Sequence, residues 1–178
     1  MRVAYADPAY PGTAARYGRS EVNHERLIKA LMRFDGWALS TTSRSLRLLL
    51  PMCPEEVRVG AWVKPIGSGW GVSPMFAWEP VLFVSARPKD KDRRGDRHPP
   101  FDWVKAQNFQ AATGFLGAKP PEFCGWLFDI LGLKPEDDFL DLFHGSGAVK
   151  RAWNQWRACE MARGPLFNQG CKEEAVSG

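Results

Sequence analysis

Hydrophobic and polar positions along the chain follow two periodicities, which predict strands and helices in turn. The run Arg2–Ala6 is apolar without polar alternation, which is typical of a strand covered on both faces, and it stops at Asp7-Pro8. After Asn23, a good helix N-cap, apolar residues recur at helical spacing until Asp35-Gly36. The same reasoning predicts a strand over 37–40, a helix over 43–50 halted by Pro51, and a strand over 57–63.

The second half of the chain contains fewer regular segments. A glycine-rich loop at Gly67–Gly71 precedes a strand over 80–85, which we expect to return antiparallel beside the third strand. Residues 86–118 show no periodicity and are rich in charged residues, proline and glycine, which is typical of a functional insertion. Regularity resumes with a helix from Pro120-Pro121 to Gly132, a strand over 139–143 and a helix over 148–157.

This order of elements predicts a single α/β domain over residues 1–178, with about five strands, mostly parallel with one antiparallel strand. A content of 44% hydrophobic and 25% charged residues is ordinary for a globular protein of 178 residues. No apolar stretch reaches the length of a membrane span, and the N-terminus lacks a signal-type apolar core. The four cysteines are spaced for neither a zinc site nor a disulfide framework. We therefore expect a soluble cytoplasmic protein with reduced thiols, no membrane partner and no metal.

The positive charge is concentrated in one segment. The formal net charge is +4, and residues 85–105 hold seven Lys or Arg against four Asp. Such a basic loop is a candidate contact for a polyanion, although a solvated surface loop has the same composition.

Two segments carry residues suited to chemistry, and both follow predicted strands. In Asp7-Pro8-Ala9-Tyr10-Pro11, the Asp7 carboxylate and the Pro8 carbonyl could accept the two hydrogens of an exocyclic base amine, while Tyr10 stacks on an extruded base. Asp-Pro after a strand is also ordinary turn chemistry. The second segment, Asp141–Gly147, is a strand, a glycine loop and a helix start, which could bind an anion such as a carboxylate. It matches neither the dinucleotide fingerprint nor the phosphate loop.

These segments resemble the motifs of a known family. Residues 5–11 resemble the D-P-P-Y motif of amino-group nucleic-acid methyltransferases, and Asp141–Gly147 resembles their D-x-F-x-G-S-G motif for S-adenosylmethionine. Between them, residues 118–122 resemble the K-P segment that opens the helix before the cofactor strand. The order of motifs, with a basic insertion between them, is similar to that of the permuted β-type DNA N6-adenine and N4-cytosine enzymes, small phage and actinobacterial DNA methylases above all. The resemblance covers roughly residues 1–157.

The resemblance implies a Rossmann-like methyltransferase fold and transfer of a methyl group from S-adenosylmethionine to N6 of a flipped adenine in double-stranded DNA. An aspartate at the head of the first motif is commoner in the adenine branch. The catalytic residues it implies are Asp7, Pro8 and Tyr10. The cofactor-binding residues it implies are Lys119, Asp141, Phe143, Gly145, Ser146 and Gly147. The candidate nucleic-acid contacts are Arg16, Arg19, Arg87, Lys89, Arg93, Arg94 and Arg97.

Three departures from the family pattern leave alternatives open. Ala9 replaces the second proline of the catalytic motif, and His144, interpreted as a loop side chain, replaces a small residue or proline. Relative to the family the chain is expected to be truncated at its C-terminus, where an acid that holds the cofactor ribose usually follows, and Glu160 is a weak substitute. RNA adenosine N6 methylation, DNA cytosine N4 methylation and a non-catalytic nucleic-acid-binding relative therefore stand as alternatives.

Three tryptophans and one lysine in or near the predicted strands can each be interpreted in two ways, as structural residues or as functional ones. We expect Trp62, Trp78 and Trp126 to pack in the core, although Trp78-Glu79-Pro80 matches a region that lines the base pocket in the family. Lys64, at a strand end, faces either substrate or solvent.

Overall fold

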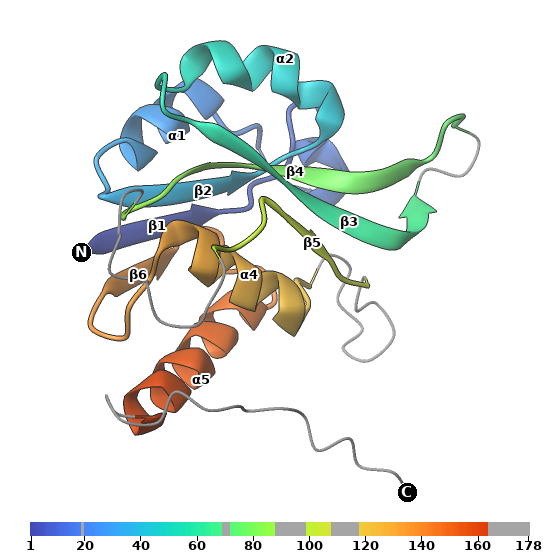
Figure 1. The fold of residues 1–178 in the computed structure, drawn as a ribbon. Coiled ribbons are helices and arrows are strands. Elements are labelled where there is room, and N and C mark those ends of the chain that lie inside the picture. Colours follow the sequence, from blue (N-terminus) through green and yellow to red (C-terminus); the bar gives the residue numbers. More distant parts are fainter. Residues whose placement is uncertain (19, 69–71, 88–98, 108–117, 164–178) are drawn as a thin grey trace, which may run out of the picture.

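A six-stranded sheet forms the centre of the molecule (Figure 1). The computed structural model describes residues 1–18, 20–68, 72–87, 99–107 and 118–163. The strands lie in the order β5-β3-β4-β2-β1-β6. Their bounds are β1 Arg2–Ala6, β2 Gly36–Ser40, β3 Arg58–Ser68, β4 Phe76–Val84, β5 Trp103–Lys105 and β6 Asp138–Asp141.

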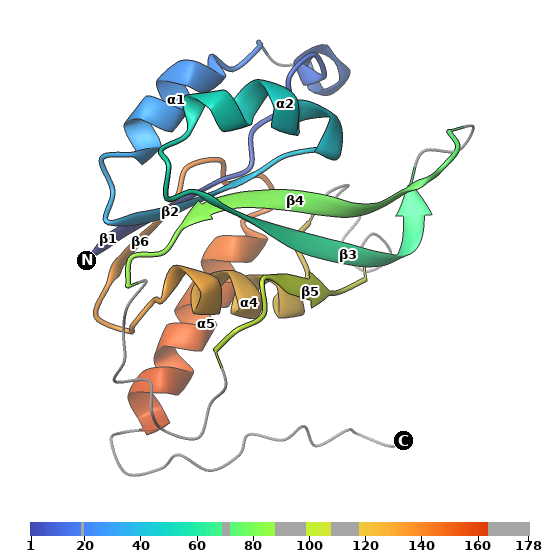
Figure 2. The ribbon, with the colours of Figure 1, turned by 45° about the horizontal axis from the view of Figure 1, so that its top comes forward.

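Helices cover both faces of the sheet, so the domain has three layers (Figures 1 and 2). The helices α1 (His24–Leu31) and α2 (Leu46–Leu49) lie on one face, where Ile28, Leu31 and Leu49 pack on Leu39 and Leu82. The helices α4 (Pro121–Leu131) and α5 (Ala148–Arg163) lie on the other face, over an aromatic-rich core. No helix in the described part of the chain is long and apolar enough to cross a membrane.

The sheet has the strand directions that the sequence predicts. β1 pairs in parallel with both β2 and β6, and β3 pairs in parallel with β5. β4 runs antiparallel to both of its neighbours, β2 and β3, and is the one strand of the described sheet that does so. The expectation of a mostly parallel α/β sheet with one antiparallel strand is therefore confirmed.

Local signals also place several helix ends correctly. The Asn23 side chain caps α1 by accepting a hydrogen bond from the Arg26 N–H at 2.9 Å. α4 has proline in its first turn and ends at Gly132, whose φ of 69° is the left-handed conformation that favours glycine at a C-cap.

Several elements differ in detail from the expectation. The sheet in the described part of the chain has six strands where about five are expected, because β5 pairs with β3 inside the segment 86–118, which shows no periodicity. β3 continues through Ser68 and β4 begins at Phe76, so part of the expected glycine loop belongs to a longer ribbon. The helical segment after β2 is split into 3-10 and α turns and passes Pro51 to Met52. Finally, α5 continues beyond 157 to Arg163.

A buried carboxylate fastens the start of β1 to the turn before β6. Asp137 accepts hydrogen bonds from the Met1 amine at 2.8 Å, from the Lys134 N–H at 2.8 Å and from the Arg87 guanidinium at 2.6 and 2.8 Å. Burial by itself would raise the pKa of Asp137, but these donors outweigh burial and hold its pKa well below the ordinary range. The ionised form of Asp137 therefore stabilises the fold.

We expect Asp137→Asn to lower the free energy of unfolding at pH 7 by about 2 kcal/mol, because charge-assisted hydrogen bonds are lost in a partly buried site. A carboxylate with a depressed pKa stabilises the fold above its unfolded pKa, roughly 4, and that contribution is lost as the pH falls through the folded pKa. Urea unfolding of both proteins at pH 7 and pH 3 should show the difference between them shrinking at low pH. Parallel pH profiles for the two proteins would contradict this assignment.

Candidate active site

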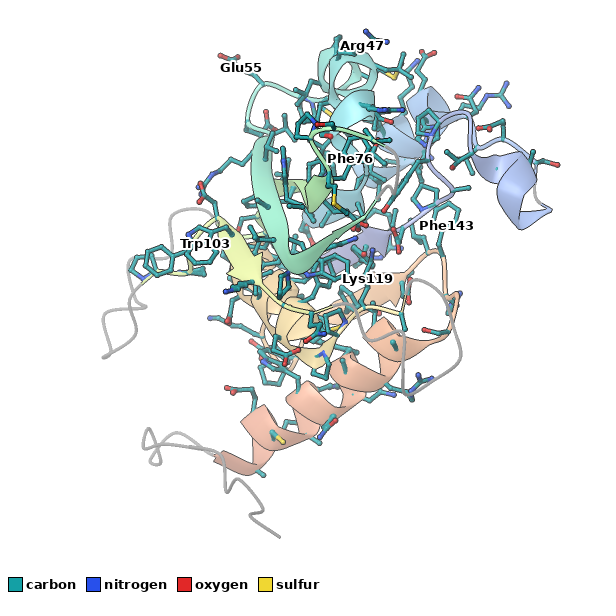
Figure 3. The ribbon with its side chains drawn as sticks, turned by 90° about the vertical axis from the view of Figure 1, so that its right-hand side faces the viewer. Arg47, Glu55, Phe76, Trp103, Lys119 and Phe143 are labelled. Atoms are coloured by element: carbon teal, nitrogen blue, oxygen red, sulfur yellow. The ribbon has the colours of Figure 1, made fainter. Side chains whose placement is uncertain are left out.

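The two segments singled out in the sequence lie side by side at the carboxyl edge of the sheet. β1 and β6 are parallel neighbours with Tyr5 opposite Asp141, and the Leu142 N–H donates to the Tyr5 carbonyl at 2.9 Å. The turn after β1 and the loop after β6 therefore leave the sheet next to each other, as sites in open α/β sheets do. Figure 3 views this edge, with Lys119 and Phe143 labelled on it.

Asp7 forms an ion pair with a buried lysine. Lys119 Nζ lies 3.0 Å from Asp7 Oδ2, and the two side chains are 6% and 24% exposed. Burial raises the pKa of Asp7, and the positive charge of Lys119 opposes that rise. Burial would lower the pKa of Lys119, but Asp7 and its other acidic neighbours raise it well above its ordinary value. The charged form of Lys119 is therefore favoured, beside an aspartate whose pKa is raised.

Glu79 on β4 joins this pair to two further groups. It forms an ion pair with Lys64, and its Oε2 lies 3.5 Å from Lys119 Nζ. The Tyr10 hydroxyl donates to the same Oε2 at 3.2 Å. Burial would raise the pKa of Glu79, but the two lysines lower it overall, and burial raises the pKa of Tyr10 well above its usual range. The cluster thus holds two carboxylates and two ammonium groups with a neutral phenol.

Aromatic rings form the floor beneath the two lysines. Lys64 Nζ and Lys119 Nζ lie 4.5 and 5.0 Å from the centre of the Trp62 ring, and Lys119 also lies 5.5 Å from the centre of Phe123. The Trp62 indole N–H donates to the Ala106 carbonyl at 2.9 Å, which fixes the ring. These cation–π contacts stabilise the two ammonium groups in addition to the carboxylates of Asp7 and Glu79.

Hydrogen bonds hold the Asp7–Tyr10 turn in place although Ala9 stands where the motif that it resembles has a second proline. The Thr13 N–H and hydroxyl both donate to the Tyr10 carbonyl, at 2.9 and 2.7 Å, while the Tyr10 hydroxyl is bound to Glu79. Pro8 is buried. These bonds hold the turn at Tyr10, so the rigidity of a second proline is not needed there.

The loop after β6 exposes backbone to an incoming ligand. Gly145 and Gly147 have φ of 43° and 71°, conformations that side chains with a Cβ rarely adopt. A Cβ built on Gly145 would meet the Phe143 carbonyl oxygen at 3.7 Å, an ordinary van der Waals contact, so the positive φ rather than lack of space favours glycine here. Ser146 Oγ accepts from the Ala148 N–H at 3.4 Å, where α5 begins. A loop of this shape, followed by a helix start, suits an anionic group.

The Asp141 side chain shapes this loop from its start. Asp141 Oδ1 accepts from the Phe143 N–H at 3.2 Å. Burial raises the pKa of Asp141, and the bond from Phe143 opposes that rise. His144 is exposed, as expected of a loop side chain.

The candidate nucleic-acid contacts are the least described part of the site. The structure ties the Arg87 guanidinium to Asp137 and to the Gly132 carbonyl at 2.7 Å, so we withdraw Arg87 as a phosphate contact. Arg16 lies in a short 3-10 helix, Ala14–Tyr17. Arg19, Lys89, Arg93, Arg94 and Arg97 lie outside the described residues.

The tryptophan predictions are correct in part. Trp62 and Trp126 are buried, but Trp78 is 38% exposed, so its expected place in the core is wrong. Alternation along β4 puts Trp78 on the face of α1 and α2 and Glu79 on the opposite face, which separates Trp78 from the acidic cluster. Glu160 lies on α5, well along the helix from the glycine loop.

Sequence reasoning missed the partnership of Glu79 with Lys64 and Lys119. The available signal was a glutamate between tryptophan and proline in the otherwise apolar strand 76–84. An acid in such a place needs a cation close by.

Of the comparisons with known proteins, the one with solved structures supports the fold. No protein-family model matches the sequence, and no curated protein matches it. Among solved structures, the M1.HpyAVI–SAM complex matches with a TM-score of 0.58 and 16% sequence identity, over 87% of this chain and 78% of that one. M1.HpyAVI itself matches with a TM-score of 0.58 and 13% identity, over 88% and 77% of the two chains. The fold is the Rossmann-like methyltransferase fold. At these identities the likeness establishes the fold alone.

Proposed function

We propose that this protein transfers a methyl group from S-adenosylmethionine to N6 of adenine in double-stranded DNA. One observation carries the proposal: an Asp-Pro-Ala-Tyr turn and a glycine loop leave adjacent parallel strands at the same edge of the sheet. The fold neighbour solved with SAM supports the choice of cofactor. The aspartate at the head of the turn favours adenine.

The glycine loop and the start of α5 suit the cofactor. Because Gly145 has no side chain, a ligand could approach the backbone closely there, and the N–H groups at the start of α5 would face its carboxylate. When bound, S-adenosylmethionine supplies an activated methyl group on a sulfonium. The chain's own residues therefore need to bind and orient the methyl donor and the acceptor base and to exclude water, rather than to activate the donor.

The turn after β1 suits the exocyclic amine of a base. The Asp7 carboxylate and the Pro8 carbonyl would accept the two amine hydrogens, which localises the nitrogen lone pair for attack. The Tyr10 ring, held through its hydroxyl by Glu79, would stack on the extruded base. As N6 gains the methyl group it must lose a proton, and Asp7, with its raised pKa, is the nearest acceptor.

Labelled methyl transfer to matched oligonucleotides tests the proposal. We expect label to appear as N6-methyladenine in duplex DNA, and cofactor binding to be measurable by calorimetry without DNA. Label on cytosine N4, or on RNA alone, would refute the assigned substrate. Cofactor binding without transfer to any of these substrates would point to a non-catalytic nucleic-acid-binding relative.

A further inference from the structure

A second surface at the carboxyl edge carries positive charge without neutralising acids. Ser43, Arg44 and Arg47, from the turn after β2 and from α2, line a shallow hollow of about 470 Å³. In the described part of the chain, neither arginine forms an ion pair with a carboxylate. The sequence from Gly36 to Pro54 contains no acidic residue at all. Arg44 and Arg47 are both exposed, and the nearest acidic residues in the sequence are Asp35, Glu55 and Glu56.

The hollow is built on an aromatic support. The Arg44 guanidinium lies 4.9 Å from the centre of the Phe76 ring, at the start of β4. Phe76 belongs to the outer part of the β3–β4 ribbon, which projects beyond the carboxyl edge of β1 and β2 (Figures 1 and 2). A guanidinium stacked on a ring loses less freedom when it binds a planar or tetrahedral anion.

The hollow shares its side of the molecule with the candidate active site. Figure 3 looks onto the carboxyl edge and shows Arg47, Phe76 and Lys119 in succession down this face. β1 and β2 are parallel neighbours with Ala6 opposite Leu39, so the turn after β2 leaves the sheet beside the turn that carries Asp7. Alternation along β4 puts Phe76 on the face of α1 and α2, so the hollow lies at the same edge as the Asp7 site but toward the other face of the sheet.

We propose that Arg44 and Arg47 bind phosphates of the duplex DNA whose base enters the Asp7 site. The inference rests on the proposed function, because it takes its partner from it. Two exposed guanidinium groups without acidic partners match phosphate oxygens in geometry and charge. A base can be extruded only if the flanking backbone is held, and phosphate contacts fix position without reading sequence. The surface replaces Arg87 in that role.

The test measures binding to duplex DNA over a range of salt concentrations. Arg44→Ala/Arg47→Ala should make the slope of log affinity against log salt shallower by about two, at roughly 0.9 per phosphate contact, and weaken binding about tenfold or more near 0.1 M salt. The loss should be similar on all sequences. Arg44→Lys/Arg47→Lys keeps the charges and should retain most of the slope.

A matched control removes two arginines elsewhere. Arg33 precedes β2, at the opposite edge of the sheet, and Arg157 lies in α5; both are exposed. Arg33→Ala/Arg157→Ala should leave the salt slope unchanged. Cofactor affinity and thermal unfolding of all variants should match the wild type, because none of these side chains is buried.

Several results would overturn the proposal. These are an unchanged slope in the alanine pair, an equal loss in the lysine pair or the control pair, or an effect seen on RNA or single strands but not on duplex DNA. Since binding is read without methyl transfer, the two proposals can fail separately. If the alanine pair has a shallower salt slope but the wild-type protein methylates no substrate, the phosphate-binding surface is supported and the proposed function is refuted. If the wild type methylates DNA but the alanine pair keeps the wild-type slope, the proposed function is supported and the surface is refuted.

Discussion

Asp7→Asn should reduce methyl transfer by at least about 10²-fold while leaving cofactor affinity unchanged. In the proposed reaction the change removes one acceptor and the negative charge that would face the base amine, and losing one such contact in a transition state costs on this order. It also removes the carboxylate proposed to accept the proton that leaves N6. The fold should survive, because Lys119 keeps Glu79 as a partner at 3.5 Å.

Single-turnover transfer of labelled methyl groups, with calorimetry for the cofactor, measures both effects. Asp138→Asn is a matched control, because this aspartate is 67% exposed and pairs only loosely with Arg2 at 3.9 Å, at the far end of β6. It should transfer methyl groups at the wild-type rate. Wild-type turnover by Asp7→Asn would remove Asp7 from the chemistry.

Gly145→Val should lower the affinity for S-adenosylmethionine by about 10²-fold or more. At a φ of 43° a β-branched residue is strained, and its side chain would stand between the loop backbone and the proposed ligand. The effect should appear in binding without DNA, measured by calorimetry. Gly145→Val does not directly alter the turn after β1, which is proposed to recognise the base.

Gly125→Ala in α4 is the control for this prediction. A Cβ at Gly125 would meet no atom within 4 Å, and alanine favours a helix, so the variant should bind cofactor normally and be slightly more stable. If Gly145→Val is folded by circular dichroism and binds S-adenosylmethionine with wild-type affinity, the cofactor site is elsewhere.

The sequence predicts those features of the fold that depend on neighbouring residues. The apolar run of β1, the cap at Asn23 and the Pro121 and Gly132 ends of α4 are local signals, and the structure confirms them. The meeting of the Asp7 turn with the Gly145 loop also follows, because parallel strands present their carboxyl ends at one edge.

Features that depend on pairing between distant residues could not be predicted. β5 has only three residues and exists through its pairing with β3, so no periodicity reveals it. Glu79 meets Lys64 because the β3–β4 register sets Trp62 opposite Glu79, and that register is not encoded in either strand alone. Arg87 appeared to belong to a basic loop, because its partner Asp137 is 50 residues away.

The pairing of β1 with β6 also bears on the order in which the molecule folds. The first strand of the chain lies against the last one, and the Met1–Asp137 contact spans 136 residues. Contacts of such long sequence separation require loop closure before they become favourable, so we expect them to form after the local contacts within helices. The Asp7 turn and the glycine loop would acquire their relative position only at that step. During refolding from urea, binding of S-adenosylmethionine should therefore appear with the slowest phase, after most helical structure has formed.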